Sequence, residues 1–143
     1  MFLKQQQDSQ QKKTLLLTIN DVVSDADKLS QAAAIIRQGG LVAFPTETVY
    51  GLGANALDPQ AVKGIFAAKG RPQDNPLIIH LYDSGQTQQY AKNIPPVYYA
   101  LCERFSPGPL TVILPKRDCI PMETSGGLDT VAVRIPSHPV ARE

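Results

Sequence analysis

The apolar positions of this chain alternate between the spacing of helices and the spacing of strands. Residues 26–38 carry apolar side chains at helical spacing, which predicts an amphipathic helix. A second helix is predicted from Asp58-Pro59 to about Lys69, because Asp accepts hydrogen bonds from free N–H groups and Pro fits the first turn. Further helices are predicted over residues 85–92 and 95–105. Short apolar runs predict strands over residues 14–19, 41–44, 76–81, 110–114 and 130–135, with 41–44 buried.

Residues 1–13 do not share this pattern, because they are rich in Gln and Lys and carry few apolar side chains. Such a segment cannot bury enough surface to offset the entropy lost on ordering, and we predict a flexible tail. From residue 14 onward, strands alternate with helices, and this order predicts a single α/β domain built in layers. At 143 residues and 43% hydrophobic composition, the chain is long enough to bury a core.

The charge of the chain is nearly balanced, with a formal net charge of +1 and a pI near 7.8. This balance predicts no global attraction to nucleic acid or to anionic membranes, so any affinity for phosphate must be local. No apolar run approaches the ~20 residues that a membrane-spanning helix needs, and residues 1–13 lack the apolar stretch of a secretory signal. We therefore expect a cytoplasmic protein with no membrane partner. Cys102 and Cys119 lie outside any metal-binding or disulfide pattern, and we expect both to be reduced.

The segment directly after the predicted strand at 41–44 combines hydroxyl groups with glycine. Thr46 and Thr48 offer hydroxyls and free backbone N–H groups to an oxyanion, while Gly51 and Gly53 let a ligand approach the backbone. This composition indicates a pocket for an anion or a nucleotide. Alternatively, the two threonines only complete the hydrogen bonds of a tight turn.

Three cations lie where helices or strands are predicted to end. Lys69 and Arg71 are two residues apart in a turn closed by proline, so both can point at one polyanion. Alternatively, they interact with the C-terminal end of the helix and with water. In the last predicted strand, alternation places Thr130 and Arg134 on the same face. Arg134 then either binds a substrate carboxylate or forms a salt bridge with a neighbouring helix.

His80 and Glu47 are ionisable residues whose roles the sequence leaves open. His80 ends an apolar strand, where it either binds a ligand or completes the core or its edge. Glu47 is a candidate base or metal ligand, but a single carboxylate decides neither. The chain has no P-loop, no GxGxxG after a strand, no HExxH and no recognisable Ser/His/Asp arrangement. If the protein is an enzyme, we therefore expect positioning and charge stabilisation instead of a covalent nucleophile.

Four motifs in this chain, taken in order, resemble the YrdC-like family of L-threonylcarbamoyladenylate synthases. They are PTETVYGLGANA (45–56), AKGRPQDNPLIIH (68–80), SPGPLT (106–111) and GLDTVAVRIPSHP (127–139). The resemblance implies an α/β fold with a YrdC-like twisted mixed sheet flanked by helices. It also implies that L-threonine, bicarbonate and ATP are condensed to L-threonylcarbamoyladenylate and pyrophosphate. That intermediate supplies the t6A modification of tRNA.

The resemblance also implies roles for individual residues. On the side of threonine and bicarbonate it implies Thr46, Thr48, Lys69, His80 and Arg134, with Arg134 at the threonine carboxylate and Lys69 near the phosphates or the bicarbonate. On the side of ATP it implies Arg71, Asn75 and Thr130. Mg²⁺ would accompany ATP and be bound mainly through phosphates and water. The implied partners also include tRNA or other proteins of the t6A pathway.

The chain departs from the family pattern at two places. Ser106 stands where family members usually carry an aromatic residue, and the family continues beyond the position of Glu143 with a further nucleotide-binding segment. The resemblance thus implies that residues 14–143 are the N-terminal portion of a single YrdC-like domain, incomplete at the C-terminal side. Three alternatives stay open: an RNA-binding YrdC-like module, a YrdC-like domain for carbamoyl transfer, and an inactive fragment.

Overall fold

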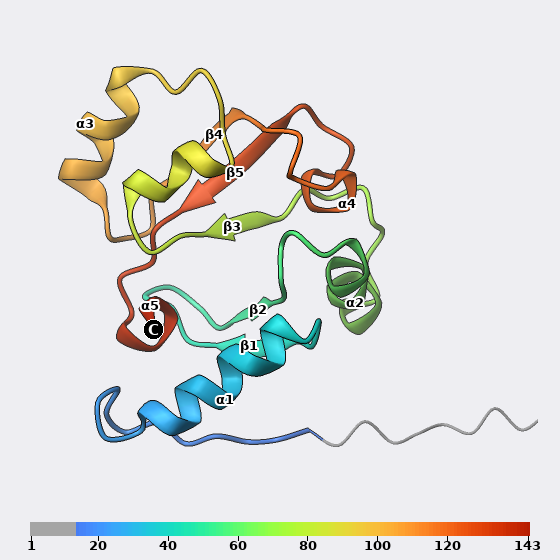
Figure 1. The fold of residues 1–143 in the computed structure, drawn as a ribbon, viewed down its shortest axis with the longest axis vertical. Coiled ribbons are helices and arrows are strands. Elements are labelled where there is room, and N and C mark those ends of the chain that lie inside the picture. The colour runs from blue at the N-terminus through green and yellow to red at the C-terminus, as the bar shows by residue number, and fades with distance from the viewer. Residues whose placement is uncertain (1–13) are drawn as a thin grey trace, which may run out of the picture.

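The computed structural model describes residues 14–143 and has an α/β fold with two separate sheets (Figure 1). Strands β1 (Val42–Phe44) and β2 (Gly51–Gly53) form a two-stranded antiparallel sheet. The other sheet has three strands in the order β3-β5-β4, with β3 parallel and β4 antiparallel to β5. These strands are β3 (Ile78–His80), β4 (Thr111–Pro115) and β5 (Thr130–Arg134). The predicted mixed sheet is therefore confirmed, although β1 and β2 do not join it. The flexible tail predicted for residues 1–13 lies outside the described residues.

The helices of the described part lie around both sheets (Figure 1). They are α1 (Ala26–Arg37), α2 (Pro59–Lys69), the 3-10 helix η1 (Ser84–Gln89), α3 (Pro96–Phe105), α4 (Met122–Ser125) and α5 (Pro139–Arg142). Helix α1 lies along the two-stranded sheet, η1 and α3 flank the three-stranded sheet, and α2 and α4 lie together at one end of the molecule.

Helix α2 begins and ends as the sequence predicts. The Asp58 carboxylate accepts hydrogen bonds from the backbone N–H groups of Gln60 and Ala61, at 2.9 and 3.3 Å. These bonds satisfy donors that have no partner inside the helix. Gly70 ends the helix with φ 59°, a left-handed conformation that costs glycine little. The predicted helices at 26–38 and 95–105 are also confirmed, as α1 and α3.

The main core lies on one face of the three-stranded sheet. Val131 and Val133 of β5 are each 2% exposed, whereas the residues that alternate with them are only partly buried. The predicted alternation along β5 is thus confirmed. Tyr98 and Cys102 of α3 belong to the same buried cluster. Burial raises the pKa of Tyr98 to about 12, and its hydroxyl forms a 2.6 Å hydrogen bond with Thr87 of η1.

Two predicted strands differ from the structure in the N-terminal part of the chain. Residues 14–19 form no strand, so that prediction is wrong. Within them, the backbone carbonyl of Thr18 accepts a hydrogen bond from the Lys28 ammonium, at 2.8 Å, instead of from a neighbouring strand. The strand predicted at 41–44 exists as β1 but is not buried, because a sheet of two strands leaves much of its surface without cover. Ala43 at its centre is exposed.

The helix predicted over residues 85–92 is shorter and of another type. It is the 3-10 helix η1, which begins where the Asp83 carboxylate accepts a 3.0 Å hydrogen bond from the Gln86 N–H. Its sequence, SGQTQQ, offers no apolar stripe that would favour continued α-helix. Thr87 is its only buried residue.

Helix α4 packs against α2 and is followed in the chain by β5. The Thr124 hydroxyl donates to the carbonyl of Ala56, at 2.6 Å, and Glu123 forms a 3.2 Å ion pair with Lys63 of α2. The Thr124 carbonyl accepts from the N–H of Leu77, at 2.9 Å. These contacts hold the segment 74–77 beside the turn that leads into β5.

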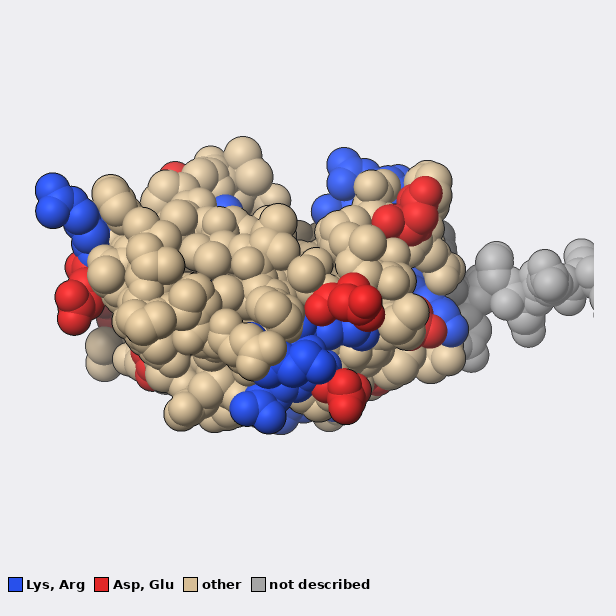
Figure 2. All heavy atoms as spheres, turned by 90° about the horizontal axis from the view of Figure 1, so that it is seen from above, with Lys and Arg blue, Asp and Glu red and all other residues tan. Residues whose placement is uncertain are grey.

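The surface carries charges of both signs. Figure 2 shows one face, on which uncharged residues cover most of the area and basic side chains lie next to acidic ones. Such mixing agrees with the net charge of +1. In the part of the chain that the structure describes, no helix has the length and apolar character needed to cross a membrane.

Candidate functional site

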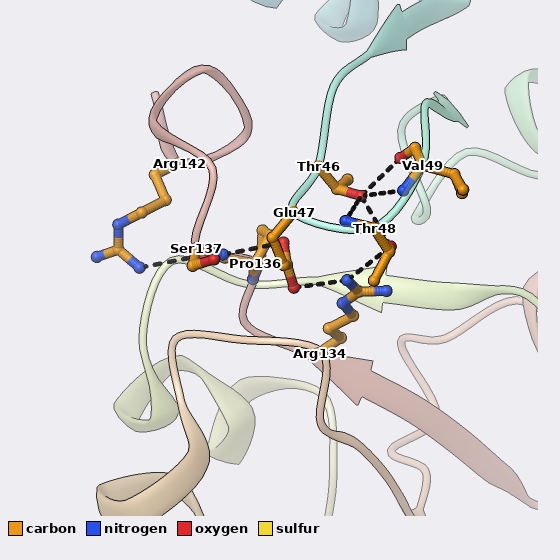
Figure 3. Close-up of polar contacts among 8 residues, drawn as sticks. All are labelled: Thr46, Glu47, Thr48, Val49, Arg134, Pro136, Ser137 and Arg142. Atoms are coloured by element: carbon orange, nitrogen blue, oxygen red, sulfur yellow. Dashed lines mark hydrogen bonds and ion pairs between the residues drawn. The ribbon is translucent and has the colours of Figure 1, made fainter.

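The turn between β1 and β2 is organised by the hydroxyl of Thr46 (Figure 3). This hydroxyl donates to the carbonyl of Val49, at 2.6 Å, and accepts from the N–H groups of Thr48 and Val49, each at 3.3 Å. Thr46 therefore closes the turn in the way that the alternative interpretation of the sequence describes. Because its single proton is used on Val49, Thr48 must be the donor in the 3.1 Å contact between the two hydroxyls.

Arg134 reaches this turn from the end of β5. Its Nη2 atom donates to Glu47 Oε1, at 2.6 Å, and to Thr48 Oγ1, at 3.2 Å. The second carboxylate oxygen of Glu47 accepts from the N–H of Ser137, at 3.2 Å. The turn and the segment after β5 thus meet at one ion pair (Figure 3). The salt bridge that the sequence left open does form, but its partner lies in the turn and not on a helix.

The guanidinium of Arg134 is mostly covered, and its hydrogen bonds are incomplete. The side chain is 13% exposed, and its Nε is buried without a hydrogen-bond partner among the described residues. A buried donor left unpaired costs about 1–3 kcal/mol, so it usually indicates a missing partner. Nη1 also donates to none of the described residues, and a ligand with a carboxylate or another oxyanion would accept from it.

Glu47 is an anion held in place by its neighbours. Loss of hydration acts to raise the pKa of its carboxyl, but the hydrogen bonds from Arg134 and from backbone N–H groups outweigh this, and the pKa is lowered. Within residues 14–143, no group of three or more His, Cys, Asp or Glu side chains is placed to hold a metal ion.

His80 lies beside Arg134 in the sheet and is exposed, not part of the core. One side of its ring packs edge-on against Phe44, with 5.8 Å between the ring centroids. Partial loss of hydration and then the charge of Arg134 lower the pKa of His80, while the charge of Glu47 acts in the opposite direction. The imidazole is therefore neutral near pH 7, and each ring nitrogen can serve as donor or acceptor according to its tautomer.

The sequence-predicted residues fall into two groups. Thr46, Thr48, His80 and Arg134 meet at one end of β5. Thr130 is at the other end of β5, about 13 Å away at roughly 3.3 Å per residue. The exposed Asn75 lies on the same side as Thr130, since its backbone is next to the turn at Gly126.

Lys69 and Arg71 are both exposed at the end of α2. Within residues 14–143, neither side chain belongs to an ion pair. Their roles stay predictions.

Sequence reasoning gave no role to two contributors to this site. The N–H of Ser137 binds Glu47, and Thr111 of β4 lies opposite Arg134 in the sheet register. A backbone donor leaves no trace in residue types, so Ser137 could not be found from the sequence. Thr111 could have been proposed, because it follows the turn of the SPGPLT motif and pairs with the strand that carries Arg134.

Comparisons with known proteins agree with this fold. Residues 34–143, most of the chain, match the Sua5/YciO/YrdC family model, which is described as "Telomere recombination". The chain belongs to the Sua5/YciO/YrdC family. The resemblance inferred from the four motifs is thereby confirmed.

Similar proteins of this family carry the name threonylcarbamoyl-AMP synthase. The protein of that name from Pyrococcus abyssi is 56% identical, over 90% of this chain and 37% of its own length. The one from Bacillus subtilis is 49% identical, over 90% of this chain and 38% of its own length. The chain thus spans somewhat more than a third of the length of these curated relatives.

A solved structure of P. abyssi Sua5 complexed with L-threonine has the same fold. It is 61% identical with a TM-score of 0.79, over 80% of this chain and 34% of that one. The predicted YrdC-like α/β fold is therefore confirmed. The roles given to individual site residues stay predictions.

Proposed function

We propose that this chain is part of a threonylcarbamoyl-AMP synthase, a nucleotidyltransferase that condenses L-threonine, bicarbonate and ATP to L-threonylcarbamoyladenylate and pyrophosphate. The observation that carries the proposal is the group of Arg134, Thr48 and His80 in a chain 61% identical to a protein solved with L-threonine. The names of the similar proteins support the same reaction.

The amino-acid end of the substrate pocket is proposed at this group. Arg134 keeps the N–H donors on Nη1 for the threonine carboxylate, because Glu47 and Thr48 occupy only Nη2. Thr48 lies 3.1 Å from the Thr46 hydroxyl and can rotate its own hydroxyl, so toward a ligand it can accept or donate a hydrogen bond. The neutral imidazole of His80 lies beside them and offers a further polar contact.

The nucleotide end is proposed around Asn75, Thr130 and Arg71. Two of these residues lie toward the α4 end of β5, so ATP would approach along the face that Thr130 shares with Arg134. Lys69 would add positive charge for the phosphates or for bicarbonate. ATP would bind as its Mg²⁺ complex, with the metal held mainly by phosphates and water.

The proposal has consequences for partners and location. The product would be an intermediate for the t6A modification, passed to other proteins of that pathway and finally to tRNA. A cytoplasmic location fits this use and stays a prediction.

A direct assay tests the reaction. The full-length protein is incubated with labelled bicarbonate, L-threonine and Mg–ATP, and pyrophosphate release is followed together with the labelled adenylate. We expect release that requires threonine. Release that is the same without threonine, or none at all, would contradict the proposal.

Arg134→Ala tests the amino-acid end of the pocket. Since Arg134 is proposed to pair with a carboxylate, its loss should weaken threonine binding by about 2–3 kcal/mol and leave ATP binding nearly unchanged. Both affinities are measured by calorimetry. Arg104→Ala, which removes an exposed arginine of α3, is the matched control. Equal losses for threonine and ATP in folded Arg134→Ala would show that Arg134 has a structural role only.

A further inference from the structure

Glu47 links two parts of the chain that are far apart in sequence. Its Oε1 accepts from Arg134, 87 residues away, and its Oε2 accepts from Ser137, 90 residues away. The side chain is 18% exposed. Each carboxylate oxygen is thus held by a donor from the segment at and after the end of β5, so the carboxylate has little freedom to turn toward another partner.

This geometry speaks against the two roles that the sequence left open for Glu47. A general base works best with a pKa near the operating pH, whereas the pKa of Glu47 is lowered from an ordinary value that is already acidic. A metal ion would have to compete with Arg134 and Ser137 for the two oxygens of Glu47. A fixed anion that orients its neighbours is the role that remains.

The hydrogen bonds of Arg134 show what Glu47 orients. A guanidinium has five N–H donors in one plane, and Glu47 and Thr48 use the two protons of Nη2. Fixing Nη2 fixes the plane, and the donors on Nη1 then point in a defined direction, whereas Nε is buried. Because Glu47 leaves the Nη1 donors free, it does not occupy the side of the guanidinium where a ligand carboxylate would bind.

Glu47 and Thr48 are neighbours in the turn between β1 and β2. Thr48 accepts from the same Nη2 atom, so the position of its hydroxyl depends on the plane of the guanidinium. We propose that Glu47 is a positioning residue of the amino-acid subsite, which does not touch the ligand but holds Arg134 and the 46–49 turn together so that Arg134 and Thr48 face it. This inference rests on the proposed function, since it assumes that the ligand is an α-amino acid.

Glu47→Gln tests the inference, because it keeps the shape of the side chain and removes its charge. The NH₂ group of glutamine cannot accept a hydrogen bond, so either Arg134 or Ser137 loses its acceptor. We expect threonine affinity, measured by calorimetry, to fall about 10- to 100-fold, while ATP affinity changes by less than about twofold. Glu103→Gln makes the same change at an exposed glutamate of α3 and should alter neither affinity.

A double-mutant cycle separates positioning through Arg134 from general structural damage. If Glu47 acts through Arg134, Glu47→Gln should weaken threonine binding no further in an Arg134→Met background. A further loss of about tenfold there would overturn the inference. Should Glu47→Gln fold poorly, Glu47→Asp keeps the charge on a shorter side chain, and we expect it to weaken threonine binding less than Arg134→Met does.

Other outcomes would also overturn the inference. Tighter threonine binding by Glu47→Gln would mean that Glu47 competes with the ligand for Arg134. Unchanged threonine binding, or equal losses for threonine and ATP, would mean that Glu47 has no specific effect on this subsite. Failure of the wild-type protein to bind threonine would instead contradict the proposed function itself, and the two failures are thus distinguishable.

Discussion

His80 lies close to two opposite charges, and its pKa depends on both. Arg134 lowers this pKa and Glu47 raises it, in addition to the larger effect of lost hydration. In the folded protein the pKa of His80 is below the ordinary value of 6.5, so as pH falls His80 takes up a proton in the unfolded chain before it does so in the folded one. His80 therefore reduces the stability of the folded state as pH falls below about 6.5, and it has no such effect at higher pH.

The two charges predict opposite effects of two substitutions on His80. Arg134→Met should raise its pKa, because a nearby positive charge is lost, and Glu47→Gln should lower it further. Titration of the imidazole protons by NMR measures both shifts, and His138→Asn assigns the signals of the two histidines in the chain. Shifts in the same direction would show that packing, and not charge, sets this pKa.

At the scale of residues, the sequence identified most members of the site but not their contacts. Thr48, His80 and Arg134 could be proposed because hydroxyl, imidazole and guanidinium groups at strand ends suit a polar ligand. The pair of Glu47 with Arg134 could not be, since its members are 87 residues apart and each has several possible partners. Contacts of this kind are decided by the fold.

At the scale of elements, the helices followed from periodicity and caps, while short strands were less certain. Helix α2 was predictable because Asp58 and Gly70 mark its ends and its apolar stripe is buried. A strand needs a partner that can lie anywhere in the chain, and the apolar run at 14–19 has none among residues 14–143. Its sequence alone does not carry that information.

The turn between α4 and β5 gives a test at this scale. A Cβ atom at Gly126 would lie 2.9 Å from both the Asp74 carbonyl oxygen and the Pro76 nitrogen, whereas one at Gly127 would meet nothing within 4 Å. Both glycines have positive φ, at 58° and 82°. Alanine at either position therefore strains the backbone, but only alanine at Gly126 also displaces the segment that carries Asn75.

We expect Gly127→Ala to lower the free energy of unfolding by about 1 kcal/mol and Gly126→Ala by at least about 2–3 kcal/mol. Only Gly126→Ala should weaken ATP binding, if Asn75 contacts ATP as proposed. Urea unfolding and ATP calorimetry on both variants measure these effects. Equal stability losses would contradict the clash, and unchanged ATP binding by folded Gly126→Ala would contradict the role of Asn75.

At the scale of the whole molecule, the division into two sheets was not predictable, because strand pairing is non-local. The buried cluster lies on the three-stranded sheet, and it includes residues from each of its strands. By contrast, α1 has no buried residue, and β1 and β2 are only partly covered. The stability of the described part is therefore unevenly distributed.

Hydrogen exchange measures this difference. We expect the amides of β5, in the centre of the three-stranded sheet, to exchange only on global unfolding, and those of β1 to exchange faster by local opening. Threonine should slow exchange at residues 46–49, since the ligand is proposed to bind Arg134 and Thr48 across the two sheets. Equal protection of Val42–Phe44 and Thr130–Arg134 without ligand would contradict this expectation.

The hydrogen bonds in the turn between β1 and β2 follow one another in a single direction, and the turn can therefore report whether a ligand is bound. Arg134 donates a hydrogen bond to Thr48, Thr48 donates to Thr46, and Thr46 donates to the carbonyl of Val49. A ligand that draws on Arg134 or Thr48 changes the polarisation along the chain, and the last bond ends on a main-chain carbonyl. The vibrational frequency of that carbonyl, labelled with ¹³C at Val49, would therefore follow occupancy of the subsite without any label on the ligand.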